Sequence, residues 1–140
     1  MKQLLFSFFI SSFFMPAVMS MDVQYKVISK DPARASAIVA YTAQEYTAQE
    51  NEVGKIYYAI DAGKITWIWV DEYMCNKGIG SQLFRRAIED MQSVPRVTWY
   101  SLDTAVEFYL KLGAQIDKYS SFGGAYMSID PKRVVAQKNE

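Results

Sequence analysis

The feature that most constrains this sequence is a glycine-containing corner where an apolar strand gives way to an amphipathic helix. The segment "KITWIWV" at 64–70 is rich in β-forming residues, and the helix after the corner carries an apolar stripe on one side. Between them, Gly78 and Gly80 stand beside Lys77. This succession predicts a strand-turn-helix unit, in which the first N–H groups of the helix have no intrahelical acceptor.

Unpaired N–H groups and the helix dipole make the start of this helix a candidate anion site. Glycine has no Cβ, so Gly78 and Gly80 let the backbone bend and let phosphate oxygens approach the N–H groups. A dinucleotide fingerprint requires a third glycine where Leu83 stands, and a nucleotide P-loop requires Gly-Lys-Ser/Thr after an earlier glycine. Neither pattern is present, and the alternative interpretation is a tight turn that binds nothing.

Composition excludes several kinds of chemistry. The chain of 140 residues has the length and apolar content of one globular domain. Its formal net charge is zero, which provides no basic field, so we expect no nucleic-acid partner. Histidine is absent, which excludes Ser-His-Asp and Cys-His catalysis and histidine metal ligands. Cys75 is the single cysteine, so no internal disulfide can form and we expect no metal site.

The first residues, "MKQLLFSFFISSFFMPAVMS" at 1–20, differ from the rest of the chain. Lys2 precedes an apolar run that ends before Pro16. This layout is typical of a secretory signal peptide with Met21 as the first mature residue; alternatively, Met21 is the true start and the leader is a mis-assigned extension. The run is too short for a confident membrane span. We therefore treat 1–20 as a hydrophobic leader and 21–140 as the folded domain, with no stable membrane span after residue 20.

Local patterns predict alternating strands and helices along the domain. Asp31-Pro32 provides an N-cap and a proline at the first helical position, and the alanine-rich segment after it is predicted to continue as helix. The tandem repeat "YTAQEYTAQE" at 41–50 then falls on the end of this helix or in a loop. This order predicts an α/β domain with a mixed central sheet flanked by helices. The predicted strands lie at 23–27, 55–60, 64–70, 96–100 and 123–130, and the helices begin at Asp31, at the glycine corner and near Thr104, before a charged, frayed tail.

The strand at 64–70 is predicted to be central in this sheet. Ile65, Trp67 and Trp69 are expected to point to one face, and Ile68 and Val70 to the other. Because both sets are apolar, we expect both faces of the strand to be covered.

Two segments resemble the signatures of the GNAT acetyltransferases. The segment "IWVDEYMCNKGIGSQLFRRAI" at 68–88 resembles the family's coenzyme A motif, in which a strand ending in valine leads to Gln/Arg-x-x-Gly-x-Gly/Ala and a helix. The segment "AVEFYLKLGA" at 105–114 resembles the later signature Ala-x-x-Phe-Tyr-x-Lys-x-Gly-Phe. Both occur in the family's order, separated by one helix and one strand. The resemblance implies the GNAT fold and N-acetyltransferase activity, with acetyl-CoA as the donor and no metal.

The resemblance also implies roles for individual residues. The main chain at Trp69 and Val70 would hydrogen-bond the pantetheine arm of coenzyme A as though it were an added strand. Tyr109 would protonate the departing thiolate; alternatively, it is a core residue at helical spacing with Phe108 and Leu112. The main-chain N–H groups of the turn would hold the diphosphate, and the turn residues are Asn76, Lys77, Gly78, Ile79, Gly80 and Ser81.

The sequence departs from the family pattern at several positions. Cys75 replaces the usual Gln or Arg of the coenzyme A motif, and Leu102 replaces an asparagine that would contact the pantetheine. Lys64 occupies the strand position where some members carry a catalytic glutamate, which leaves Asp71, Glu72 or water to accept the amine proton. Only two predicted strands follow the first helix before the glycine turn, where the family usually has three. We therefore expect a shortened N-terminal half.

From these residues we predict an N-acetyltransferase that moves acetyl from acetyl-CoA directly to a primary amine of a small molecule or peptide. The alternative hypothesis is a non-catalytic acyl-CoA-binding or interaction module of the same fold, which the departures at Cys75 and Leu102 favour. Because acetyl-CoA is a cytosolic metabolite, cytoplasmic action is favoured, with export as the alternative suggested by the leader. Exposed strand edges make a homodimer a further expectation.

Overall fold

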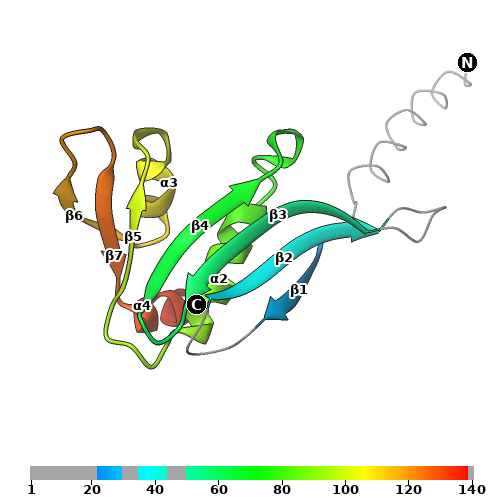
Figure 1. The fold of residues 1–140 in the computed structure, drawn as a ribbon, viewed down its shortest axis with the longest axis horizontal. Helices are drawn as coiled ribbons and strands as arrows, with labels where there is room; N and C mark the ends of the chain where they lie inside the picture. Colours follow the sequence, from blue (N-terminus) through cyan, green and yellow to red (C-terminus); the bar gives the residue numbers. More distant parts are fainter. Residues whose placement is uncertain (1–21, 30–34, 44–49, 139–140) are drawn as a thin grey trace, which may run out of the picture.

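The computed structural model of the chain describes residues 22–29, 35–43 and 50–138 (Figure 1). The leader predicted at 1–20 and the Asp31-Pro32 pair lie outside these residues. The described strands are β1 (Gln24–Ser29), β2 (Ala35–Ala43), β3 (Glu50–Ala59), β4 (Lys64–Val70), β5 (Val97–Ser101), β6 (Gln115–Tyr119) and β7 (Ala125–Ile129). The described helices are α2 (Ile79–Asp90), α3 (Val106–Lys111) and α4 (Pro131–Lys138), with 3₁₀ turns η1 (Glu72–Met74) and η2 (Asp103–Ala105).

All the described strands belong to one seven-stranded mixed sheet, in the order β1-β2-β3-β4-β5-β7-β6. Strands β1 to β4 are antiparallel neighbours, as are β5, β7 and β6. The parallel pair β4–β5 joins these two halves and is paired only at Lys64 and Thr98. The sheet therefore opens between β4 and β5 beyond this single point. The mixed α/β sheet and the central place of β4 confirm the prediction.

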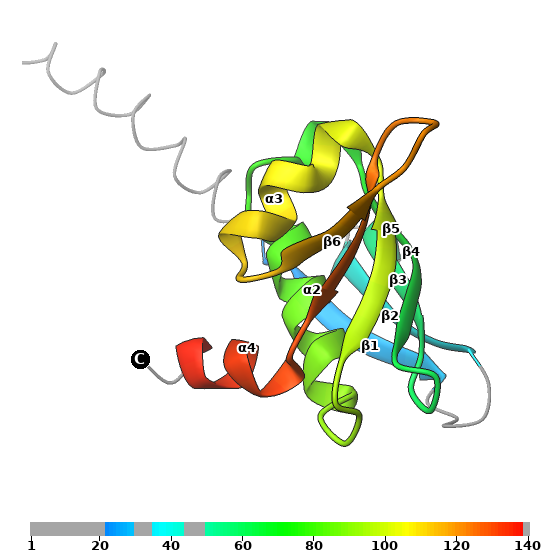
Figure 2. The same cartoon turned by 90° about the vertical axis from the view of Figure 1, so that its left-hand side faces the viewer.

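The described helices α2, α3 and α4 lie on one face of the sheet (Figure 2). Helix α2 packs its apolar stripe on β2, β3 and β4 and carries much of the core. Among the residues that the structure describes, no helix has both the length and the apolar character needed to cross a bilayer. The buried residues of α2 are Ile79, Leu83, Phe84, Ala87 and Ile88.

The helix predicted from Asp31 onward is wrong over 35–43, because this segment forms strand β2. Alanine favours helix locally, but Ile38 and Val39 are β-branched and both faces of the segment are covered. Pairing with β1 and β3 along the strand decides its structure. Three strands, β2, β3 and β4, therefore precede the glycine corner after β1, so the predicted number of two is wrong.

The first residues of the tandem repeat at 41–50 belong to the end of β2, and its last residue begins β3. Its residues 44–49 lie outside the described part of the chain. Tyr41, in β2, pairs with Glu52 of β3. The first tyrosine of the repeat is therefore part of the sheet.

The frayed tail predicted after the last strand is also wrong, because residues from Pro131 onward form α4. The Asp130 carboxylate accepts a hydrogen bond from the Lys132 N–H at 3.0 Å, and Pro131 occupies the first helical position. Val134 is buried, and α4 contacts α2. Strand β6, for which the sequence pattern predicts no element, forms the edge of the sheet beside β7.

The predicted faces of β4 are only partly right. The register against β3 shifts between Trp67, which pairs with Tyr57, and Ile65, which pairs with Tyr58. This bulge at Thr66 places Ile65 in the core, whereas the Trp67 side chain is 49 % exposed. One face of β4 is therefore open, contrary to the expectation that both are covered.

Candidate functional site

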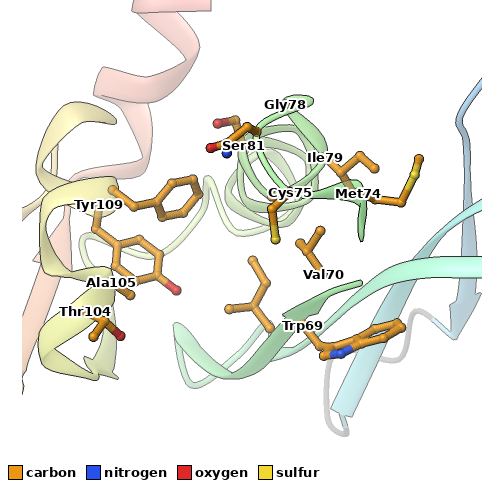
Figure 3. Close-up of a pocket in the computed structure, with 14 residues that line it drawn as sticks. Trp69, Val70, Met74, Cys75, Gly78, Ile79, Ser81, Thr104, Ala105 and Tyr109 are labelled. Carbon is orange, nitrogen blue, oxygen red and sulfur yellow. The ribbon is translucent and has the colours of Figure 1, made fainter. Parts of the chain in front are cut away.

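A cavity of about 620 Å³ lies where the sheet opens, between the end of β4, the first turn of α2 and helix α3 (Figure 3). It brings together the two segments that resemble the family signatures, although a helix and a strand separate them in the chain. Its size is that of a small-molecule site. The lining residues are Ile68, Trp69, Val70, Met74, Cys75, Asn76, Gly78, Ile79, Gly80, Ser81, Thr104, Ala105, Phe108 and Tyr109.

The start of α2 presents unpaired main-chain donors to this cavity. Gly78 is the N-cap, and no side chain caps the helix. The first hydrogen bond of the helix runs from the Gln82 N–H to the Gly78 carbonyl at 3.0 Å. The N–H groups of the residues between Gly78 and Gln82 therefore have no acceptor within the helix. These donors and the positive end of the helix dipole suit an anion.

The two glycines of the corner serve different ends. Gly78 has φ +81°, a left-handed conformation that other residues rarely adopt, but a Cβ there would meet no atom within 4 Å. A Cβ on Gly80 would lie 3.3 Å from Phe108 Cζ and 3.6 Å from Val70 Cγ2. Gly78 therefore permits the turn, whereas Gly80 permits close packing of α2 against β4 and α3.

The end of β4 contributes its main chain. Because β4 pairs with β5 only at Lys64, the edge of β4 that faces the opening is unpaired at Trp69 and Val70. On the β3 side, by contrast, the Asp71 N–H donates to the Val53 carbonyl at 2.9 Å. The Trp69 indole points away from the cavity (Figure 3), so its backbone forms the wall. An open strand edge can receive an extended amide-containing chain by β-augmentation.

Tyr109 combines a core ring with a hydroxyl directed at the cavity (Figure 3). Its ring centroid lies 5.5 Å from that of Phe84, 5.1 Å from that of Trp99 and 4.9 Å from that of Phe108. Only 5 % of the residue is exposed. Burial raises the pKa of the Tyr109 hydroxyl to about 12, because the charged form loses hydration. The group therefore keeps its proton at neutral pH and can donate it.

Several residues named from sequence lie elsewhere. Lys77 is exposed and does not line the cavity. The Asp71 carboxylate accepts a hydrogen bond from the Tyr73 N–H at 3.0 Å, which caps η1, and neither Asp71 nor Glu72 lines the cavity. Cys75 does line it, and its thiol donates to the Asp71 carbonyl at 3.5 Å. Within the described part of the chain, no carboxylate therefore lines this cavity.

Other lining residues were not among those predicted as site residues. Thr104 and Ala105 come from η2, and Phe108 comes from α3 beside Tyr109. The segment at 105–114 that resembles the later family signature contains Ala105 and Phe108. The resemblance could therefore have indicated that these two residues lie near acetyl-CoA. Ile68 and Met74 carry no such signal, because apolar residues at a strand end or a turn are ordinary core candidates.

Comparison with protein families matches residues 34–113 to the acetyltransferase (GNAT) domain. No curated protein sequence matches the chain. Among solved structures, nourseothricin acetyltransferase is similar at 15 % identity and a TM-score of 0.57, covering 79 % of this chain and 85 % of that one. Because the identity is low, this structural similarity shows a shared fold.

Two further similar structures contain a coenzyme A ligand. A mutant of the toxin AtaT, bound to the C-terminus of the antitoxin AtaR and acetyl-CoA, matches at 12 % identity and a TM-score of 0.62, covering 85 % of this chain and 99 % of that one. PaiA N-acetyltransferase from Thermoplasma acidophilum, in complex with coenzyme A, matches at 17 % identity and a TM-score of 0.56, covering 69 % of this chain and 60 % of that one. At these low identities, the two similarities also show a shared fold.

Proposed function

We propose, from the premise that this chain belongs to the GNAT acetyltransferase family, that it transfers acetyl from acetyl-CoA directly to a primary amine of a small molecule or peptide. Family membership establishes an acetyltransferase that uses acetyl-CoA; the acceptor and the residue roles are the proposal. The observation that supports it is the convergence of three features on one cavity. These are the uncapped start of α2, the unpaired edge of β4 and the Tyr109 hydroxyl.

Main-chain groups bind the donor in this proposal. The N–H groups from Asn76 to Ser81 hold the diphosphate, because they are uncapped and lie at the positive end of the α2 dipole. Asn76 and Gly78 both have positive φ, which curls the chain ahead of the helix. The pantetheine lies along β4 and hydrogen-bonds to the main chain at Trp69 and Val70. Lys77 contributes its N–H and a nearby positive charge.

Transfer then needs no covalent enzyme intermediate. The neutral amine nitrogen attacks the thioester carbonyl, a C–N bond forms, and the C–S bond breaks. The Tyr109 hydroxyl gives its proton to the departing thiolate sulfur, and the nitrogen loses a proton to water. The tyrosinate recovers a proton from solvent, so the products are the N-acetylamine and coenzyme A thiol. Positioning the amine beside the thioester supplies most of the acceleration.

Water, and not a side chain, accepts the amine proton in this mechanism. The cavity lining contains no carboxylate among the described residues, and Asp71 is engaged in capping η1. The activity should therefore depend on the fraction of amine that is unprotonated in solution, and the rate should increase with pH until the amine is neutral.

The test is thiol release from acetyl-CoA by the full chain, followed with a thiol reagent across a panel of primary amines. Release should require an amine, and mass spectrometry should detect the matching N-acetyl product. The Tyr109→Phe variant should bind acetyl-CoA like the wild type but turn over slowly. If folded protein binds acetyl-CoA and no amine on a broad panel supports release, the chain does not carry out the proposed reaction.

A further inference from the structure

Two further hollows adjoin the cavity at the end of β4, which we call the donor cavity because the proposed function places acetyl-CoA there. The first, of about 240 Å³, shares Ile68, Ala105 and Tyr109 with the donor cavity. The second, of about 590 Å³, shares lining residues with the first, namely Ile65, Thr66, Trp99 and Tyr100. We call the first the neck and the second the outer hollow. Together they form a continuous path from Tyr109 along the opening of the sheet.

The neck is uncharged and rich in aromatic residues. Its described lining contains no Asp, Glu, Lys or Arg. Trp67, at the neck, is 49 % exposed, and its ring lies 5.5 Å from that of Tyr57. Tyr100 lines both hollows, and its ring lies 5.2 Å from that of Tyr126 in the outer hollow. Exposed flat rings beside a hollow suit a ligand that presents a flat ring of its own.

The charges along the path argue against a polycationic acceptor. Lys64 and Asp117 are the charged residues that line the outer hollow, and their charges are opposite. A polyamine or an aminoglycoside carries several ammonium groups, which would need several carboxylates to offset their desolvation. Over the described residues, the path offers a single carboxylate, with a lysine on the same hollow.

We propose that the acceptor is a small primary monoamine with an aromatic ring. Its amine lies in the neck beside Tyr109, and its ring lies against Trp67 and Tyr100. The inference rests on the proposed function, because it assigns the acceptor of that same reaction. The described lining of the neck has no carboxylate to pair with an ammonium group, which disfavours the charged form of the amine and so favours the form that attacks.

The test compares four amines in thiol-release kinetics with the full chain: tyramine, 2-phenylethylamine, hexylamine and spermidine. Both aromatic amines should exceed hexylamine and spermidine in kcat/KM by a factor of about ten or more, since stacking on the rings is lost with the latter two.

Two variants and a control assign this preference to named residues. Tyr100→Ala removes a half-exposed ring that lines the neck, so it should lower kcat/KM for both aromatic amines. Trp67→Ala should lower kcat/KM for both aromatic amines and leave hexylamine unchanged. Phe122→Ala removes a ring that is 94 % exposed and lines none of these hollows, so it should change none of the values. Circular dichroism checks that each variant is folded.

The outcomes separate the inference from the proposed function. If hexylamine, spermidine or a peptide α-amine is acetylated as efficiently as tyramine by the wild type, the inferred acceptor class is wrong while the proposed reaction stands. If no amine supports thiol release although acetyl-CoA binds, the proposed function itself fails.

Discussion

The donor cavity and the neck meet at Tyr109, but different groups of the protein face the ligand in each. The donor cavity offers main-chain atoms, namely the uncapped N–H groups of α2 and the open edge of β4. The neck offers aromatic side chains, led by Trp67 and Trp99. Ligand binding by main-chain atoms depends on backbone geometry, so such a site tolerates a changed side chain, such as Cys75 in place of the usual Gln or Arg. A site made of side chains changes its specificity with a single substitution.

The largest effect should come from the residue that both regions share. Tyr109→Phe removes the hydroxyl and keeps the ring that packs on Phe84 and Trp99. Loss of a general acid should lower kcat by about 10²- to 10⁴-fold. The dissociation constant for acetyl-CoA, measured by calorimetry, should stay within a factor of about two. A variant with nearly unchanged kcat would show that Tyr109 is a core residue only.

A substitution at the α2 corner tests whether backbone geometry makes the donor site. Gly80→Val adds carbon atoms where a Cβ alone would already lie 3.3 Å from Phe108 Cζ. The displaced first turn of α2 should raise the Kd for acetyl-CoA by at least about tenfold. Gly123→Ala is the matched control: Gly123 also has a positive φ but does not line the cavity, so the cost should appear as about 1–2 kcal/mol of lost folding stability. Equal weakening of acetyl-CoA binding by the two variants, with stability unchanged, would contradict these separate roles.

The pH dependence of stability should report the burial of Tyr109. Its pKa is raised from 10.0 to about 12, so the protonated form is favoured in the folded protein. The resulting stability is fully present below pH 10 and is lost as pH rises from about 10 to 12. In urea unfolding at pH 9 and pH 11, wild type should lose about 1 kcal/mol more than Tyr109→Phe. Identical losses in the two proteins would show that the hydroxyl is not buried in this way.

The smallest effect should come from Lys77, whose side chain is exposed and does not line the cavity. Lys77→Ala should raise the Kd for acetyl-CoA by less than about threefold, and the difference should shrink in 0.5 M salt because exposed charges are screened. A loss of tenfold or more that persists in salt would mean that the donor site relies on this side chain and not on main chain.

The same local signal succeeds at one end of the chain and misleads at the other. Asp130-Pro131 begins α4, as an N-cap and first-turn proline should. Asp31-Pro32 predicts a helix over the segment that forms β2 instead. An Asp-Pro pair favours only the first turn of a helix. The secondary structure of the residues that follow depends on the elements that pack against them. Apolar Ile38 and Val39 lie in a strand with both faces covered, which a local pattern of alanines does not reveal.

The donor cavity was largely predictable because its signals are contiguous. The turn from Asn76 to Ser81 and the end of β4 carry their own geometry, and all of these predicted residues except Lys77 line the cavity. The neck was not predictable, since it depends on the bulge at Thr66 and on the single pairing between β4 and β5. Register shifts and strand separation are set by tertiary contacts, so the exposed face of Trp67 could not be assigned from alternation.

The most direct test of the diphosphate site compares the affinities of two donors for the full chain. Isothermal titration calorimetry should give 1:1 binding of acetyl-CoA with a Kd of about micromolar order. S-acetylpantetheine, which lacks the diphosphate, should bind at least about 100-fold more weakly, because the uncapped N–H groups of α2 then have no anion to hold. If folded protein gives no heat with millimolar acetyl-CoA, or binds both compounds equally well, the start of α2 is not a diphosphate site.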